Sequence, residues 1–141
     1  MFDDLKESWY VSKVEAVIQT EINKLPLMFR NHTEGLAHGI VLYQYKVNAV
    51  VFGFFSGKRL NPSLVAAHSV LMFIDAYGFN GTIIVNGEDC LGTLKIICMN
   101  LMVVLDTTPL DNLEVSFLEN FSAPVFNRVF ADDLKGSNFN F

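Results

Sequence analysis

The most constraining feature of this sequence is a twenty-residue apolar segment, LAHGIVLYQYKVNAVVFGFF, which runs from Leu36 to Phe55 and carries one charge, on Lys46. A membrane-spanning helix needs about 20 apolar residues with few or no charges, and polar side chains interrupt the middle of this segment. A lysine at the centre of a bilayer costs about 2.5–3.5 kcal/mol on the insertion scale. We therefore expect the segment to be buried in a protein core and not in a membrane.

The spacing of apolar residues in this segment favours a helix. They recur three or four residues apart, at Leu36, Ile40, Tyr43, Val47, Val50 and Phe54, and the segment is longer than an ordinary strand. Gly57 follows at a position suited to a helix C-cap. The pattern predicts a long, mostly buried helix with one wet edge, formed by Gln44, Lys46 and Asn48. The alternative is a pair of strands over 39–54, folded at Asn48–Ala49, because residues 43–48 also alternate.

The rest of the chain also shows mainly helical spacing. Residues 2–25 form an amphipathic pattern that Pro26 should end, and we expect Trp9 and Tyr10 to anchor this helix in the core. Asn61-Pro62 predicts a helix start, with asparagine as N-cap and proline at the first helical position, and Gly78 predicts its end. Three more helices are expected over 91–104, from Thr108-Pro109 to 121, and from Ser122 to Gly136 with Pro124 in the first turn.

One segment favours a strand. Residues 82–85 are β-favouring and lie between two Asn-Gly pairs, which are typical of turns. No partner strand is evident unless the apolar segment supplies one. We therefore predict a mainly α fold, a compact bundle of about five to six helices with one short strand around 82–86. The alternative is an α+β fold with strands from 39–54 and 82–86.

Length and composition fit one domain. The chain has 141 residues, of which 51% are apolar, and it has no internal repeat or linker. We expect a single helical domain over 1–136 and a frayed tail over 137–141. Cys90 and Cys98 form no CxxC pair, and the N-terminus is acidic at once, unlike a secretory signal. A reducing, cytoplasmic location is therefore expected.

Acidic side chains gather in the last third of the sequence. The net charge is −5, and the stretch from Asp106 to Lys135 has six acids against two bases. No basic cluster could bind a phosphate backbone, so we expect no nucleic-acid partner. Acidic surfaces raise the association rate with basic partners and help to select them. The candidate partner-binding residues are the six acids, Asp106, Asp111, Glu114, Glu119, Asp132 and Asp133.

No catalytic motif is evident. Residues 53–59, GFFSGKR, lack the glycine spacing of a phosphate loop and have Arg59 where serine or threonine must reach magnesium. The three histidines lack the spacing of a metal site, and His68, among apolar neighbours, is expected to be a core residue. Cys90 begins a helix, but acidic neighbours oppose thiolate formation there. We expect no catalytic residue, cofactor or metal.

These observations favour a non-enzymatic protein that binds another protein. The first hypothesis is an inhibitor or immunity-type factor that neutralises a basic partner through an acidic and apolar surface. The alternative is an adaptor or chaperone for a secretion or assembly machine, with a groove or a dimer interface. The second alternative is a small-ligand-binding protein or enzyme with a pocket built from His38, His68, Tyr43 and Tyr45. No membrane partner is expected, and the sequence does not indicate the oligomeric state.

Overall fold

The computed structural model describes residues 2–30, 32–53 and 57–134, and its fold is mainly α, as predicted. The predicted tail over 137–141 and the predicted cap at Gly136 lie outside these residues. In chain order the elements are α1 (Phe2–Asn23), α2 (Leu27–Arg30), α3 (Leu36–Asn48), the 3₁₀ turn η1 (Ala49–Phe52), α4 (Pro62–Tyr77), β1 (Ile84–Val85), β2 (Glu88–Asp89), α5 (Leu91–Asp106), α6 (Asn112–Phe117), the π-helical segment η2 (Leu118–Ser122), α7 (Ala123–Val129) and α8 (Ala131–Leu134).

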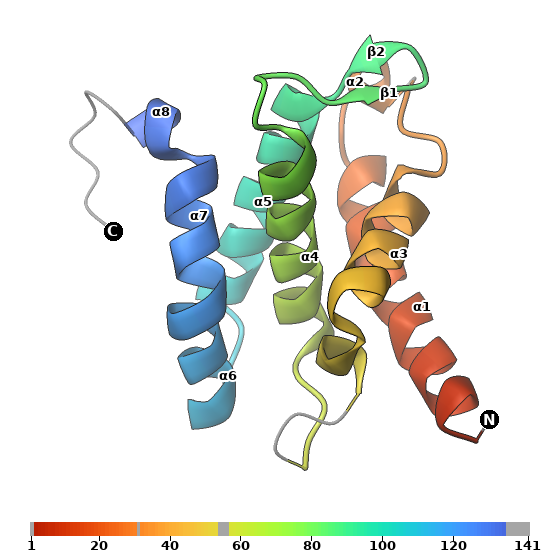
Figure 1. Cartoon of the computed structure of the whole chain (residues 1–141), viewed down its shortest axis with the longest axis vertical. Helices are drawn as coiled ribbons and strands as arrows, with labels where there is room; N and C mark the ends of the chain where they lie inside the picture. Colours follow the sequence, from red (N-terminus) through yellow and green to blue (C-terminus); the bar gives the residue numbers. More distant parts are fainter. Residues whose placement is uncertain (1, 31, 54–56, 135–141) are drawn as a thin grey trace.

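Helix α4 is the central element of the molecule. It packs against α1, α3, α5 and α7, and in Figure 1 it stands between α3 on one side and α7 on the other. All residues from Leu64 to Leu71 are buried, as suits a helix that is apolar on every side. The predicted start is confirmed, because the Asn61 side chain accepts a hydrogen bond from the Ser63 N–H at 2.8 Å and Pro62 follows the cap.

The apolar segment at 36–55 forms a helix that is shorter than predicted. Helix α3 ends at Asn48 and the 3₁₀ turn η1 follows it. Asn48 leaves the helical region, with φ −159° and ψ 73°, so Gly57 does not cap this helix. The strand alternative placed its fold at the same Asn48–Ala49 junction, but strands over 39–54 are wrong. Residues 54 and 55 lie outside the described part of the chain.

Two expectations about single side chains are corrected. Lys46 and Asn48 are exposed as predicted, but Gln44 is 0% exposed. Gln44 lies four residues after the buried Ile40, on the side of α3 that faces the core. In α1, Tyr10 is 2% exposed and donates a hydrogen bond to the Leu60 carbonyl, whereas Trp9 is 61% exposed. Tyr10 alone of this pair anchors the helix.

The predicted strand pairs with its own neighbour and not with the apolar segment. Strands β1 and β2 are antiparallel, with Ile84 opposite Asp89 and Val85 opposite Glu88. Asn86 and Gly87 between them have φ values of 50° and 84°, which is the geometry of a two-residue hairpin turn. The strand is therefore shorter than predicted, and the second Asn-Gly pair is the turn that creates its partner.

The last third of the chain forms one helical run where two separate helices were predicted. It begins at Asn112, not at Thr108-Pro109, and continues through α6, η2 and α7 without a break at Ser122. The π turn is where Pro124 is accommodated. Proline has no N–H to donate, and in the wider turn the Ala123 N–H bonds to the Leu118 carbonyl, five residues back.

Candidate protein-binding surface

The structure divides the six predicted acids into separate groups. Asp111 and Glu114 form a capping box at the start of α6. The Asp111 side chain accepts the Glu114 N–H at 2.8 Å, and Glu114 Oε1 accepts the Asp111 N–H at 3.1 Å. These reciprocal bonds satisfy backbone donors that a helix start would otherwise leave unpaired.

The same two acids also connect α6 to the start of α4. Lys58 forms an ion pair with Asp111, and this bond holds the pKa of the Asp111 carboxyl below its usual range. Glu114 is 4% exposed, and its Oε2 accepts the Asn61 N–H. Glu114 cannot contact a partner from this buried position, and its predicted role as a partner-binding residue is corrected. Asp111 is exposed, but its carboxylate is already occupied by the cap and by Lys58.

Asp132 and Asp133 lie on α8, at the opposite end of the α6–α7 run from α6 (Figure 1). Lys95 of α5 forms an ion pair with Asp133 at 2.6 Å. Arg128 forms a second ion pair with Asp75 at 3.0 Å. The acids at the two ends of the α6–α7 run are therefore separated along the molecule.

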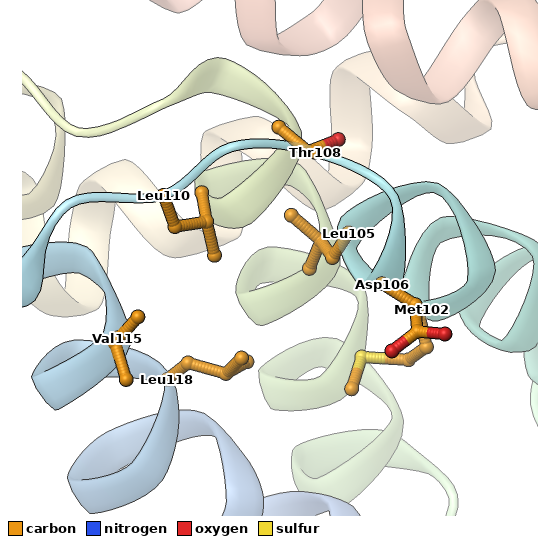
Figure 2. A pocket seen from close by; sticks show the side chains of 7 residues that line it. All are labelled: Met102, Leu105, Asp106, Thr108, Leu110, Val115 and Leu118. Carbon is orange, nitrogen blue, oxygen red and sulfur yellow. The ribbon is translucent and has the colours of Figure 1, made fainter.

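Of the two remaining acids, Asp106 lines an open pocket of about 380 Å³, which we call the α5–α6 pocket, whereas Glu119 is not one of its lining residues. In Figure 2, side chains from the end of α5 line one side, side chains from α6 and η2 line the other, and the connecting loop passes above. The lining residues are Met102, Leu105, Asp106, Thr108, Leu110, Val115 and Leu118. Glu119 is exposed and follows Leu118 directly.

Helix geometry explains why this pocket is open. Helix α5 and the segment η2 both pack against α4, and the loop between α5 and α6 keeps the two apart at this end. Thr108 Oγ1 donates to the Val104 carbonyl at 2.6 Å, which holds the loop against the end of α5. Leu105 is 4% exposed, and Val115 opposite it is 38% exposed. The pocket thus has a buried floor and an exposed apolar wall.

The charge beside the pocket is negative, and the described part of the chain does not neutralise it by an ion pair. Among the described residues, no lysine, arginine or histidine forms an ion pair with Asp106 or Glu119. By contrast, Asp111, Asp133 and Asp75 are each paired with a cation. Asp106 lines the α5–α6 pocket and Glu119 follows the lining residue Leu118, so these carboxylates can attract a cation whose apolar neighbour enters the pocket.

The histidines of the predicted ligand pocket lie in different places. His38 is exposed on α3, with its Nδ1 2.8 Å from Glu15 Oε1. His68 is buried in α4, with its Nδ1 3.0 Å from Ser122 Oγ. Burial lowers the pKa of His68 to about 4, so the ring is neutral near pH 7. This is the satisfied core histidine that the sequence indicated.

The tyrosines of that predicted pocket do not join the histidines either. Tyr43 packs against the aromatic rings of Phe73 and Tyr77 on α4. Tyr45 lies against the Phe52 ring, with 5.9 Å between centroids. Neither tyrosine lines the α5–α6 pocket.

The cysteines have the properties of core thiols. Burial raises the pKa of Cys98 to about 12. The pKa of Cys90 is also raised, first by burial and then by Asp89 and Glu88. Within the described ranges, no group of three or more histidine, cysteine or acidic side chains could hold a metal ion.

Sequence reasoning missed most of the α5–α6 pocket. Val115 directly follows Glu114, and an apolar residue beside an acid was the available sign of an exposed apolar position in this helix. Comparison with family models, curated proteins and solved structures found no match to the chain. Among the described helices, none combines the length and the apolar character that crossing a membrane requires.

Proposed function

We propose that this protein acts by binding another protein, and that the α5–α6 pocket with Asp106 and Glu119 is its contact site. The observation that carries the proposal is a hollow with mostly apolar lining residues that includes the carboxylate of Asp106, with Glu119 next to the lining residue Leu118, and neither acid is paired with a cation among the described residues. An apolar side chain would fill the hollow, and a neighbouring lysine or arginine would meet the carboxylates. The partner is accordingly a protein with a basic, apolar segment.

The class of activity that fits this surface best is an inhibitor or immunity-type factor that works in the cytoplasm by covering part of a basic partner. Charged rims of this kind raise association rates, while apolar anchors in pockets supply most of the affinity. Neither contribution needs a catalytic group. His68 and Ser122, which are within hydrogen-bond distance, are 5% and 0% exposed, so a substrate could not reach them without local opening.

An adaptor or chaperone is the second candidate, because α5 displays apolar side chains to solvent. Ile96, Met99 and Val103 are 43%, 40% and 63% exposed and lie three and four residues apart on one side of the helix. Exposed apolar surfaces of this kind often mark interaction sites. Sizing the protein at several concentrations separates the candidates, since a strict monomer argues against a shared apolar face.

The contact site is tested by titrating isotope-labelled protein with two peptides and following backbone amide signals by NMR. The peptides are acetyl-Lys-Phe-Lys-amide and acetyl-Glu-Phe-Glu-amide, which share the apolar residue and differ in charge. We expect the basic peptide alone to shift signals of residues 102–119. Equal shifts with both peptides, or shifts elsewhere only, would contradict the proposal.

Matched variants identify the groups responsible. Asp106→Asn combined with Glu119→Gln should weaken binding of the basic peptide about three- to tenfold at low salt, because exposed ion pairs contribute modestly. Glu34→Gln, at an exposed acid of the loop before α3, is the control and should change nothing. If the control weakens binding of the basic peptide as much as the double variant does, net charge and not this site accounts for the binding.

A further inference from the structure

A second pocket is lined by α5 and the α6–α7 run, at the opposite end of these elements from the α5–α6 pocket. It has a volume of about 250 Å³ and is lined by the end of α4, the start of α5, the end of α7 and the start of α8. Its apolar walls include Phe79, Leu91 and Val129, and Asp75, Lys95, Arg128 and Asp132 are its charged lining residues. We call this hollow the α5–α8 pocket.

The two pockets are aligned along α5. Leu91 and Lys95 line the α5–α8 pocket, and Met102 and Asp106 line the α5–α6 pocket. These positions are four, seven and four residues apart, which places them on one side of the helix. The midpoints of the two pairs are residues 93 and 104, so at 1.5 Å per residue the pockets are about 16 Å apart.

The α6–α7 run borders both pockets from the opposite side. Val115 and Leu118 line the first, and Arg128 and Val129 line the second. Helices α5 and α7 both rest on α4. We call the surface between α5 and the α6–α7 run, with one pocket at each end, the α5–α7 seam. Met99 of α5 is 40% exposed and lies beside its row of lining residues.

We infer that the α5–α7 seam receives a basic amphipathic helix of a partner protein, whose apolar residues about three turns apart enter the two pockets. The inference rests on the proposed function and extends it from one contact to a recognition mode. Eleven residues of helix span about 16 Å and return to nearly the same side. A helix can pack along two neighbouring helices, ridges into grooves.

The seam is unsuited to an extended peptide. The backbone groups of α5 and α7 are used within their own helices, so an extended strand lying here would find no sheet edge for its N–H and C=O groups. A helical partner brings its backbone hydrogen bonds with it. Side chains at i, i+4, i+7 and i+11 would then form the contact stripe.

The charge of the seam selects a basic helix. Three carboxylates line the two pockets, Asp106, Asp75 and Asp132, against two cations, Lys95 and Arg128. Both cations are already paired, Lys95 with Asp133 and Arg128 with Asp75. Among the residues that the structure describes, no cation pairs with Asp106 or Glu119 near one end of the seam, or with Asp132 at the other.

The test selects peptides from a displayed library of random 20-residue sequences on the immobilised full chain. We expect the enriched peptides to have apolar residues at i, i+4, i+7 and i+11 with lysine or arginine between them, and to gain helical circular dichroism on binding. Enriched peptides with alternating apolar residues, or with a single apolar anchor, would overturn the inference.

Three variants separate this inference from the proposed function. Val115→Lys places a cation in the α5–α6 pocket, and Phe79→Lys places one in the α5–α8 pocket. Val50→Lys changes a 56% exposed valine in η1, which lines neither pocket, and is the matched control. Each pocket variant should weaken binding of the selected peptides at least tenfold, and the control should leave it unchanged.

The pattern of losses decides between the two proposals. If Val115→Lys abolishes binding and Phe79→Lys has no effect, the seam inference fails and the single-pocket function stands. If neither pocket variant weakens binding, both fail. Because Phe79 is 78% exposed, its replacement is compatible with the fold, which the helical circular dichroism of each variant verifies.

Discussion

Gln44 is a fully buried glutamine without a hydrogen-bond partner in the described structure. Both its Oε1 and its Nε2 lack a partner, although the residue is 0% exposed. A buried polar group in this condition has lost its hydration without a compensating bond, which costs about 1–3 kcal/mol. Sequence alone placed this residue at a wet edge, because an amide among apolar residues usually faces water.

Replacing Gln44 by methionine, which has a similar shape, should therefore increase the free energy of unfolding by about 1–3 kcal/mol. Urea denaturation of the variant and the wild type measures the difference. Gln19→Met, at an exposed position of α1, is the control and should change stability little. A loss of stability in Gln44→Met would show that the amide has a partner in solution.

His68 makes stability depend on pH. Its pKa is about 4 in the folded chain, against an ordinary value of 6.5, because burial disfavours the charged ring. Between these values the unfolded state binds the proton and the folded state does not. Stability therefore falls as the pH decreases from about 6.5 to about 4, by about 3 kcal/mol in total.

The variant His68→Asn keeps an acceptor or donor near Ser122 Oγ and cannot titrate in this range. Relative to the variant, the wild type should lose stability from pH 7 to pH 4 by the amount that His68 contributes. Any advantage in unfolding free energy that the wild type has at pH 7 should therefore shrink or reverse. Gln19→Met, the exposed control used for Gln44, changes no titratable group and should leave the pH profile of the wild type intact. Parallel profiles for wild type and His68→Asn would refute the assignment.

At the scale of elements, the start of α6 depends on a cap that is tied to a distant helix. Glu114 accepts two backbone N–H groups, one from Asp111 in its own helix and one from Asn61 at the start of α4. One carboxylate thus serves both helix starts. The predicted helix start at Thr108-Pro109 missed this cap, although an aspartate followed three residues later by a glutamate has the spacing of a capping box.

Glu114→Ala should reduce the free energy of unfolding by about 2–3 kcal/mol, since it leaves two part-buried backbone donors without an acceptor. Asp111→Ala should cost about 1 kcal/mol as the loss of an N-cap. Glu119→Ala, on an exposed side chain nearby, should stay within about 0.5 kcal/mol of the wild type. Thermal or chemical denaturation ranks the three, and equal costs would contradict the assigned roles.

At the scale of the whole molecule, α4 joins the two halves of the core. It contacts α1 and α3 from the first half of the chain, and α5 and α7 from the second half. The buried apolar residues of α4 belong to one continuous apolar cluster. Loss of either half would expose α4. We therefore expect the described helices to unfold in a single cooperative transition.

Cys98, which is 0% exposed on α5, reports this transition. In a Cys90→Ser background, labelling of Cys98 by a thiol reagent should occur only with global unfolding, because the thiol is buried and its pKa is raised to about 12. The urea midpoints of labelling and of helical circular dichroism should coincide. Labelling of Cys98 well below the dichroism midpoint would indicate that α5 opens on its own.

The sequence by itself determined the features that depend on a few neighbouring residues. These are the Asn61-Pro62 helix start, the Asn86-Gly87 turn and the helical period of α1, α4 and α5, since caps, turns and stripes act over one or two turns of chain. It also indicated the mainly α class and the core position of His68.

Only the tertiary structure decided which side chains face the core and which acids face water. Gln44 is buried, Trp9 is exposed and Glu114 is used inside the molecule because of helices that approach from far along the chain, as the bond from Asn61 to Glu114 shows. The α5–α6 pocket arises in the same way, where α5 and η2 pack on α4 and leave a hollow between them. Burial at these positions depends on how helices converge, and the residues next to them in the sequence do not carry that information.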